Sequence, residues 1–575
     1  MSVDVLGNDL YATRTATYRR FDGGLNTRKA QHDLDRNELA ALVNAWYAYG
    51  TALSKRPGSS VLVAALPDGG NTIGLVACRF NDLSYLIVQT SHNNVYAAQV
   101  NAAGWGAAIG TVTGGILRGA QMYDPKTAKD TVFLVTGKDT PQMWQGPGTN
   151  LVAVTTGANY LPANPSGGAL KPSYVATLGN NSHLFYAGDS TAPNAVYVSD
   201  AFAPESFTTP AMQADPYGYD GSGTFLPAVI GLNDGIDGGS VTALQTLGSA
   251  MIVFKESAIY AMVQTQLLGN VAWRVYNVAA QRGNLSPRAV VAFESFCVFL
   301  AIDGLYFTYG QPNEPINQQK ISANVPTFFD SSRFGTSALI ANRTTAVAVR
   351  NANRYIIFFD SGTGNPDTGV WFDFDVLVPG PSGASVPAAG EITGMVVGGA
   401  VQLTGPSDAG NFAWGSATSA SLGLFGVGFT DLGTAIAVSL AFKSDAFEDE
   451  LGDAAMRQNK VISRVDLLVE PLSQGGATML QFAPTFAMNH GQPIPGALAL
   501  PPINTPAQGG SWGQNWGSFN WSQSAVVAAA FVVQPIRPQR AVAAYVIQFA
   551  LAEASAFPWI LVGFVVEFNA REVSR

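Results

Sequence analysis

Residues 83–100, LSYLIVQTSHNNVYAAQV, contain two short apolar runs on either side of a polar turn. Apolar runs of this length, rich in β-branched and aromatic residues and bounded by turn residues, predict a β-hairpin. The same unit recurs in TVFLVTGKDTPQMWQG (131–146), SHLFYAGDSTAPNAVYVSD (182–200), SAMIVFKESAIYAMV (249–263), FCVFLAIDGLYFTYG (296–310) and NRYIIFFDSGTGNPDTGVWFDF (353–374). A weaker copy occurs at GMVVGGAVQLTGPSDAGNFAWG (394–415). The chain is therefore expected to be all-β.

The hairpins also follow one another at a nearly regular spacing. Their first central apolar residues are Leu86, Phe133, Phe185, Ile252, Phe299 and Ile356. A period of about 40–50 residues is typical of four-stranded propeller blades, and longer steps hold insertions. Residues 60–429 are therefore predicted to form a six- or seven-bladed β-propeller. A pair of β-sandwiches would use the same hairpins, but near-regular spacing favours radial repetition.

The two ends of the chain have a different character. Residues 35–47, DRNELAALVNAWY, predict a helix, because Asp35 and Glu38 match a capping box and apolar residues follow at helical spacing. We therefore expect residues 1–59 to form an N-terminal arm with one short helix. Residues 430–575 contain longer apolar runs separated by Pro/Gly/Gln-rich loops, which predicts a separate β-sandwich-like domain.

Composition limits the classes of function. The 575 residues carry a net charge of −9, and only 12% are charged while 47% are hydrophobic. A protein that wraps or reads nucleic acid needs a dense Lys/Arg surface, so that class is disfavoured. A surface so poor in charge indicates either extensive cover by partners or a rigid β shell with an uncharged polar surface.

Targeting and redox features point to a soluble protein assembled in a cytosol. The N-terminus lacks the basic start and apolar core of a signal peptide, and the longest apolar runs (525–533 and 559–566) are too short for a membrane helix. The only cysteines, Cys78 and Cys297, lie in apolar runs and are expected to be buried free thiols.

Chemical motifs are scarce, and we expect neither an enzyme nor a bound cofactor or metal. The four histidines (His32, His92, His183 and His490) are scattered beside turn residues without metal-ligand spacing. Asp234 and Asp237 in a Gly-rich segment could bind calcium, but Asp-Gly is first a turn signal. One imperfect Asp-box-like stretch, SDAGNFAW (407–414), is weak evidence for a propeller glycosidase. The acidic patch 444–453 is expected to be a solvated loop or a contact face.

Residues 21–58, FDGGLNTRKAQHDLDRNELAALVNAWYAYGTALSKRPG, resemble the N-terminal signature of the tail tubular protein B (nozzle) family of short-tailed phages, and of related packaged-DNA stabilisation proteins. Three later segments (181–207, 238–262 and 283–310) also look like that family, in the same order. The positions that carry the signature are Gly23, Gly24, Asn44, Trp46, Lys55, Arg56, Pro57 and Gly58.

The resemblance implies a structural virion protein that is assembled in the host bacterial cytoplasm and located in the tail. Such subunits form a ring, typically of six copies, below the portal and its adaptor ring. They support fibres or spikes, and they retain and then pass double-stranded DNA during ejection without reading its sequence. The alternatives are an internal tail plug or stopper, and a propeller that binds or cleaves bacterial glycans.

Lys55 and Arg56 are adjacent in extended chain, so their side chains should project to opposite faces. We expect one to pair with Asp33, Asp35 or Glu38, and the other to face a neighbouring subunit. Contact with DNA in the channel is the alternative, but two cations provide little phosphate contact. The sequence therefore favours an ion-paired interface.

Overall fold

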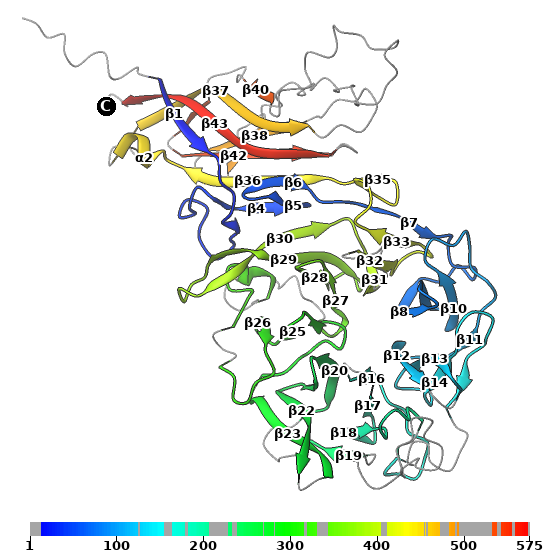
Figure 1. The fold of residues 1–575 in the computed structure, drawn as a ribbon. Helices are drawn as coiled ribbons and strands as arrows, with labels where there is room; N and C mark the ends of the chain where they lie inside the picture. The colour runs from blue at the N-terminus through cyan, green and yellow to red at the C-terminus, as the bar shows by residue number, and fades with distance from the viewer. Residues whose placement is uncertain are drawn as a thin grey trace, which may run out of the picture.

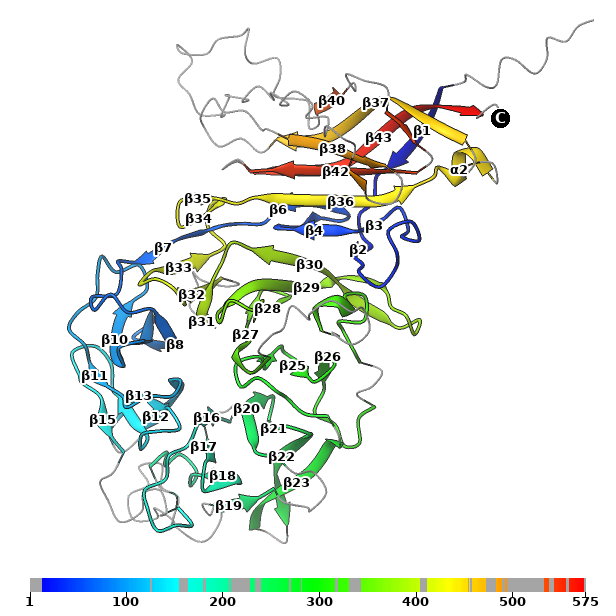
Figure 2. The same cartoon turned by 180° about the vertical axis from the view of Figure 1, so that it is seen from behind.

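The computed structural model describes residues 13–124, 127–154, 164–178, 182–205, 207, 228–232, 239–267, 270–280, 282–315, 319–329, 343–403, 411–452, 455, 458–471, 482–488, 492–493, 532–536, 542–544, 546–554 and 558–572. The regular secondary structure of this part of the chain is almost entirely β-strand (Figures 1 and 2). Its helical elements are α2 (Glu448–Leu451) and two 3-10 turns, Pro326–Phe328 and Arg343–Thr345. The expected all-β class is confirmed.

Four small sheets are antiparallel meanders whose strands follow one another in the chain. The first contains β8 (Thr72–Phe80), β9 (Leu83–Thr90), β10 (Asn94–Gln99) and β11 (Gly110–Thr111), and the second contains β12 (Arg118–Asp124), β13 (Lys129–Val135), β14 (Gln142–Trp144) and β15 (Val152–Ala153). The third contains β16 (Tyr174–Thr177), β17 (Leu184–Asp189), β18 (Ala192–Val198) and β19 (Ala228–Gly231), and the fourth contains β20 (Val241–Leu247), β21 (Ala250–Lys255), β22 (Ala258–Leu267) and β23 (Asn270–Ala280).

Three further meanders follow, and distant strands extend two of them. Strands β24 (Val291–Ala292), β25 (Cys297–Ala301) and β26 (Gly304–Thr308) form a three-stranded sheet. Strands β27 (Val347–Asn351), β28 (Arg354–Asp360), β29 (Pro366–Pro379) and β30 (Ser385–Thr393) begin a nine-stranded sheet. Strands β31 (Val397–Gln402), β32 (Phe412–Ser416) and β33 (Leu422–Phe425) begin a six-stranded sheet that continues through β7 (Ser59–Val63), β34 (Thr430–Asp431) and β35 (Thr434–Ala435).

All seven hairpins that the sequence predicted are present as antiparallel strand pairs. They are β9–β10, β13–β14, β17–β18, β21–β22, β25–β26, β28–β29 and β31–β32. The first strands of successive sheets also touch one another in order: β8 contacts β12, β12 contacts β16, β16 contacts β20, β20 contacts β24, β24 contacts β27, β27 contacts β31, and β31 contacts β8.

The remaining strands build two layers at the other end of the molecule (Figures 1 and 2). One is the continuation of the nine-stranded sheet through β4 (Ala41–Val43), β36 (Val438–Asp445), β42 (Ile547–Glu553), β38 (Phe482–Met488) and β39 (Gln492–Pro493). The other contains β40 (Val532–Ile536), β37 (Gln458–Pro471), β43 (Trp559–Glu572), β6 (Ala52–Lys55), β5 (Ala45–Tyr49), β1 (Thr13–Tyr18) and β41 (Val542–Ala544). The layers pack through aromatic rings, because Phe564 lies 4.6 Å from Phe442 and 4.9 Å from Phe549 between ring centroids.

The predicted helix over residues 35–47 is wrong. This segment instead contains β3 (Glu38–Leu39), which pairs with β2 (Gly24–Leu25), followed by β4 and the start of β5. Asp35 and Glu38 do make the local hydrogen bonds of a capping turn, since the Asp35 amide donates to Glu38 Oε2 at 2.8 Å. The chain then turns at Asn44, whose φ of 56° is incompatible with a continuing right-handed helix.

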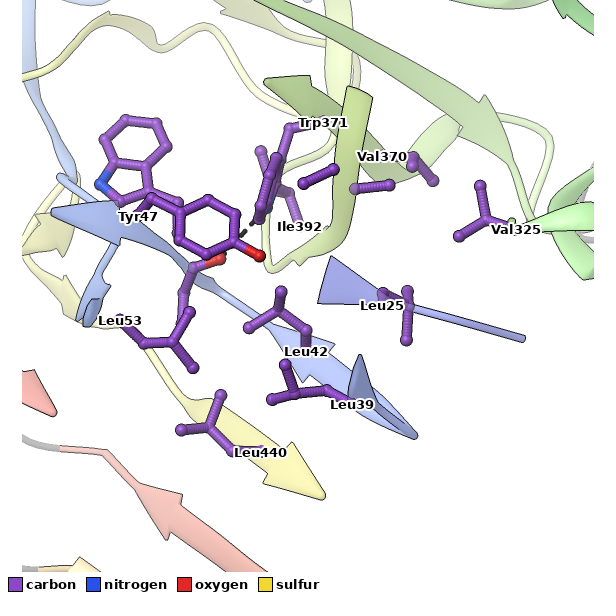
Figure 3. Close-up of a cluster of buried hydrophobic side chains, with 14 of the residues drawn as sticks. Leu25, Leu39, Leu42, Tyr47, Leu53, Val325, Val370, Trp371, Ile392 and Leu440 are labelled. Atoms are coloured by element: carbon purple, nitrogen blue, oxygen red, sulfur yellow. Dashed lines mark hydrogen bonds between the residues drawn. The ribbon is translucent and has the colours of Figure 1, made fainter. Parts of the chain in front are cut away.

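Tertiary packing explains why strands form there. Leu42 lies opposite Leu440 of β36, and both side chains are buried (Figure 3). Leu39 and Tyr47 belong to the same core, where Tyr47 meets Trp371 edge-on at 5.9 Å. Burial of such side chains contributes about 1.5–3 kcal/mol each, which outweighs the few tenths per residue of helix propensity.

The N-terminal residues are also not a separate arm in the part of the chain that the structure describes. Strand β4 lies between β30 and β36, β6 pairs with β43, and β7 pairs with β33. Residues 38–63 therefore contribute to all three of the large sheets. Similarly, β34 and β35 join the six-stranded sheet, so strands on both sides of residue 430 share one sheet.

Candidate functional site: a buried charged junction

The Lys55-Arg56-Pro57-Gly58 stretch is the link between two sheets. Strand β6 ends at Lys55 in the sheet of β37 and β43, and β7 begins at Ser59 in the sheet of β31–β33. We use "the junction" for Asn44, Lys55, Arg56 and Gly58 together with their partners Thr393, Asp431 and Glu553. These residues come from segments far apart in the sequence, so the junction holds separate sheets together.

Lys55 forms a fully buried ion pair. Its Nζ lies 3.0 Å from Glu553 Oε2 at the end of β42, and the two side chains are 0% and 1% exposed. The same carboxylate oxygen accepts a hydrogen bond from Trp559 Nε1 at 3.1 Å. Burial lowers the pKa of Lys55, and the Glu553 charge opposes that shift. The Lys55 charge and the Trp559 hydrogen bond together offset the cost of removing the Glu553 carboxylate from water.

Arg56 binds the opposite part of the junction. Its guanidinium forms a two-pronged ion pair with Asp431, with Nη1 at 3.1 Å from Oδ1 and Nη2 on Oδ2. Its Nε donates to Asn44 Oδ1 at 2.9 Å, and its remaining protons face the carbonyl oxygens of Pro57 and Thr393. The planar fork of arginine suits this bidentate geometry, and lysine would not reproduce it.

Asn44 connects these groups through every polar atom of its side chain. Its amide donates to Thr393 Oγ1 at 2.9 Å and to the Ala437 carbonyl at 2.7 Å, while Oδ1 accepts from the Thr393 amide at 3.0 Å as well as from Arg56. Asparagine is one of the few residues besides glycine that tolerates a positive φ. The left-handed backbone and the four hydrogen bonds together account for this residue type.

Gly58 allows the closest backbone approach of the junction. A Cβ at this position would lie 2.5 Å from the Thr430 amide nitrogen, and the nearby atoms are backbone rather than a flexible side chain. The Gly58 amide donates to the Gly428 carbonyl at 2.8 Å, and its carbonyl accepts from the Gly426 amide at 3.0 Å. Only glycine fits, because any side chain would push the two segments apart.

The other signature residues lie outside this cluster. Trp46 packs edge-on against Phe425 at 5.8 Å, and the Arg354 guanidinium lies over its ring at 4.4 Å. Gly23 and Gly24 are beside the β2–β3 pair, where a Cβ on Gly23 would lie 2.6 Å from Glu38 Cγ and Gly24 has a φ of 64°. Pro57 is half-buried in the link itself. Trp46, Gly23 and Gly24 thus have packing roles away from the junction.

The predicted partners of Lys55 and Arg56 are wrong. Asp35 and Glu38 bind Lys29 at 2.7 and 2.8 Å, not Lys55 or Arg56. The side chains of Lys55 and Arg56 are 0% exposed, so neither faces DNA or another subunit in this structure. Sequence reasoning missed Asp431, Thr393 and Glu553, because nothing local in their segments marks them as partners of residues several hundred positions away.

Other predicted features are dispersed. Of the histidines, His32 and His92 lie near Asp33 and Asp68 at the surface, whereas His183 is buried. Within the described ranges, no group of three His, Cys, Asp or Glu residues could hold a metal ion. His490, both calcium candidates (Asp234 and Asp237) and the first half of the Asp-box-like stretch (407–410) lie outside those ranges.

The acidic patch at 444–453 is a contact within the chain. Asp445 accepts hydrogen bonds from Tyr18 Oη at 2.6 Å and Arg36 Nε at 2.8 Å, and Arg36 also reaches Glu450 at 2.6 Å. Both cysteines are buried free thiols, and burial raises the pKa of each, that of Cys297 to about 12. In the residues with assigned positions, no helix has the length and apolar character needed to cross a bilayer.

Comparison with solved structures gives the remote similarities described below. No protein-family profile and no curated protein matches the chain. Among solved structures, it is similar to a Kuenenia stuttgartiensis hydrazine synthase (TM-score 0.36, 10% identity, 63% of this chain and 97% of that chain). It is also similar to PorZ, a surface component of the type-IX secretion system of Porphyromonas gingivalis (TM-score 0.31, 11% identity, 64% of this chain and 38% of that chain). Similarities this remote identify neither the fold nor the function.

Proposed function

We propose that this chain is a non-catalytic subunit of a short-tailed phage tail, a nozzle protein that forms a ring around the DNA exit channel below the portal and adaptor. In this role six copies retain the genome and then let it pass during ejection. The proposal begins from the ordered set of nozzle-like segments in residues 21–310, of which 21–58 is the most specific.

The observation that carries the proposal is the junction. The resemblance identified Asn44, Arg56 and Gly58 only by their order in the sequence. In the structure these residues lie together in one buried network with Asp431 and Thr393. Their chemistry is used for joining sheets and not for contacting a substrate. A subunit that surrounds DNA under pressure must keep its shape. Buried ion pairs and hydrogen bonds between its sheets would help it to do so.

The finer fold belongs to the same proposal. We infer a closed seven-bladed β-propeller over residues 59–425, supported by the cyclic order of contacts between first strands and by the pairing of β7 with β33. In propellers, an N-terminal strand that completes the last sheet closes the ring. The C-terminal strands are then a β-sandwich-like part, supported by the packing of Phe564 against Phe442 and Phe549.

A ring of identical copies requires heterologous contacts that close on themselves. Negative-stain imaging and mass photometry of the purified full chain, alone and with its portal and adaptor proteins, test this directly. We expect six-fold rings in at least one of the two conditions. A chain that stays monomeric in both, and that antibody labelling does not find on virion tails, would exclude the nozzle role.

A further inference from the structure

A group of aromatic side chains lies beside the three-stranded sheet of β24–β26. We use "the aromatic patch" for Phe296, Phe307, Tyr309 and Phe374. The ring centroids of Phe307, Tyr309 and Phe374 lie 5.6, 6.3 and 5.1 Å from that of Phe296. Phe296 immediately precedes β25, Phe307 lies in β26, and Phe374 lies in β29 of the nine-stranded sheet. Two sheets therefore bring four rings into contact.

The rings of the aromatic patch are in contact with solvent. Phe296, Phe307 and Phe374 are only partly buried, and Tyr309 is 45% exposed. The buried Phe293 supports them, since it stacks on Phe296 with 4.8 Å between centroids and 10° between ring planes. Neighbouring large rings that remain partly in water after folding mark a binding surface, whereas single exposed apolar residues do not.

Polar groups with unused hydrogen-bonding capacity border the aromatic patch. The Arg350 guanidinium lies over the Phe293 ring at 4.8 Å, and its Nε donates to the Ala352 carbonyl at 2.7 Å. Its two terminal nitrogens have no partner among the described residues. Asp375, which directly follows the patch ring of β29, is exposed, and its Oδ1 accepts from Asn353 Nδ2 at 2.9 Å. The border thus offers both donors and acceptors to a ligand.

The charges at the border indicate the class of ligand. Arg350 is positive, whereas Asp375 and the exposed Glu294, in the turn between Phe293 and Phe296, are negative. An apolar protein face packed on the patch would remove these charges from water without giving them partners, which costs free energy. An acidic polymer would meet two carboxylates and one cation. A neutral sugar fits better, because its C–H face can pack on aromatic rings while its hydroxyls donate to carboxylates and accept from a guanidinium.

We propose that the aromatic patch is a binding site for a neutral polysaccharide. Sugar rings pack on Tyr309 and Phe307, which lie 5.3 Å apart between centroids, and hydroxyls bind Arg350 and Asp375. One copy of the chain contains the whole site, so the proposal is independent of the nozzle function.

Saturation-transfer-difference NMR of the full chain with cellohexaose, maltohexaose, mannohexaose and chitohexaose tests the site. We expect at least one of these sugars to receive saturation on its ring C–H protons. Tyr309→Ala should weaken its binding by about tenfold, which corresponds to about 1.4 kcal/mol. Tyr123→Ala is the matched control and should bind normally, because Tyr123 is 41% exposed but has no other ring beside it in the part of the chain that the structure describes.

Absence of saturation transfer from the wild type to all of these sugars would overturn the site, as would undiminished binding by Tyr309→Ala. If circular dichroism shows that Tyr309→Ala does not fold, Arg350→Gln provides the same test, since it leaves the rings in place and should also weaken binding. If no sugar binds and Tyr309→Ala loses rings in mass photometry, the patch is a contact between copies, which contradicts the proposal. Sugar binding by a chain that never forms rings would support the site while excluding the nozzle role.

Discussion

The small sheets and the junction are both built of strands, but their strands find partners at very different distances along the chain. In the sheet of β8–β11 every strand pairs with the next one in sequence. Next to the junction, β4 pairs with β30 and β36, and β6 pairs with β43. Closing such long loops costs entropy that hairpins avoid. The comparison teaches that sheets made of sequence neighbours are stabilised mainly by contacts between apolar side chains. Sheets that join strands far apart in the sequence also need specific polar contacts.

The largest expected difference between the two regions is in how much the free energy of unfolding falls when one cationic side chain is removed. Arg56→Ala leaves Asp431 and Asn44 without their buried partner, so the free energy of unfolding should fall by about 3–5 kcal/mol. Arg79→Ala in the first small sheet removes an exposed pair with Asp82 and should cost no more than about 1 kcal/mol. Urea denaturation followed by tryptophan fluorescence measures both, and similar midpoints for the two variants would contradict the comparison.

A pH-dependent effect is expected at His183, which immediately precedes β17 of the third small sheet and contacts Gln264 of β22 in the fourth. His183 Nδ1 donates to the Ser199 carbonyl at 2.8 Å, and Nε2 accepts from the Gln264 amide at 2.7 Å, so the ring is held neutral. Burial lowers the pKa of His183 from 6.5 to about 4. The unfolded chain therefore binds a proton first, and stability should fall by about 3 kcal/mol as the pH drops from 6.5 to about 4, with no further loss from this group below that.

The contribution of His183 can be separated from that of the carboxylates. His183→Gln should flatten the pH dependence of the urea midpoint in this window, relative to the wild type, whereas substitution of the exposed His92 by Gln should not. Parallel pH profiles for the wild type and His183→Gln would show that the ring does not titrate as its surroundings require.

A smaller difference is expected for two glycines. Gly58→Ala should destabilise the chain by about 1–3 kcal/mol, because the added carbon meets the backbone of Thr430. Gly104→Ala is the control beside the first small sheet, where nothing lies within 4 Å of the added carbon. That substitution should be neutral or slightly stabilising. The urea midpoints of the two variants measure these effects. An unchanged midpoint for Gly58→Ala would mean that the link between β6 and β7 is not tightly packed.

The smallest effect should be on the reactivity of Cys297. In a Cys78→Ala background, labelling of Cys297 by a thiol reagent should be slow, because burial suppresses the thiolate. Adding Arg56→Ala should change that rate by less than about threefold, since the sheet of β24–β26 opens locally through its own hydrogen bonds. A large acceleration would show that the two regions open together.

The fold was predictable where the signal is local. Runs such as Leu83–Thr90 and Cys297–Ala301 carry both their strand pattern and their turn, so the hairpins and the all-β class followed from sequence. The helix over 35–47 failed because Leu39 and Leu42 satisfy a helical period equally well, and the strands that bury them lie almost 350 residues or more further along the chain.

The two cations of the candidate site and their pairing with carboxylates were predictable from the sequence, but the residues that pair with them were not. Lys55 and Arg56 were identified as unusual cations, and an ion pair was the favoured interpretation. Their partners Glu553 and Asp431 could not be named, because the pairing depends on β6 meeting β43 and β7 meeting β34 in three dimensions.

The pairing of Ser59 with Phe425 also sets an order of events during biosynthesis. Strand β7 leaves the ribosome early, yet its partner β33 is translated more than 350 residues later. At about 5–20 residues per second, the edge of β7 stays uncovered for roughly 20–70 s, while the hairpins between them can already fold. Val61 belongs to this strand, and its side chain is still 64% exposed in the folded protein. A newly made chain therefore passes through a stage in which an unpaired strand can be captured by a chaperone or by another chain.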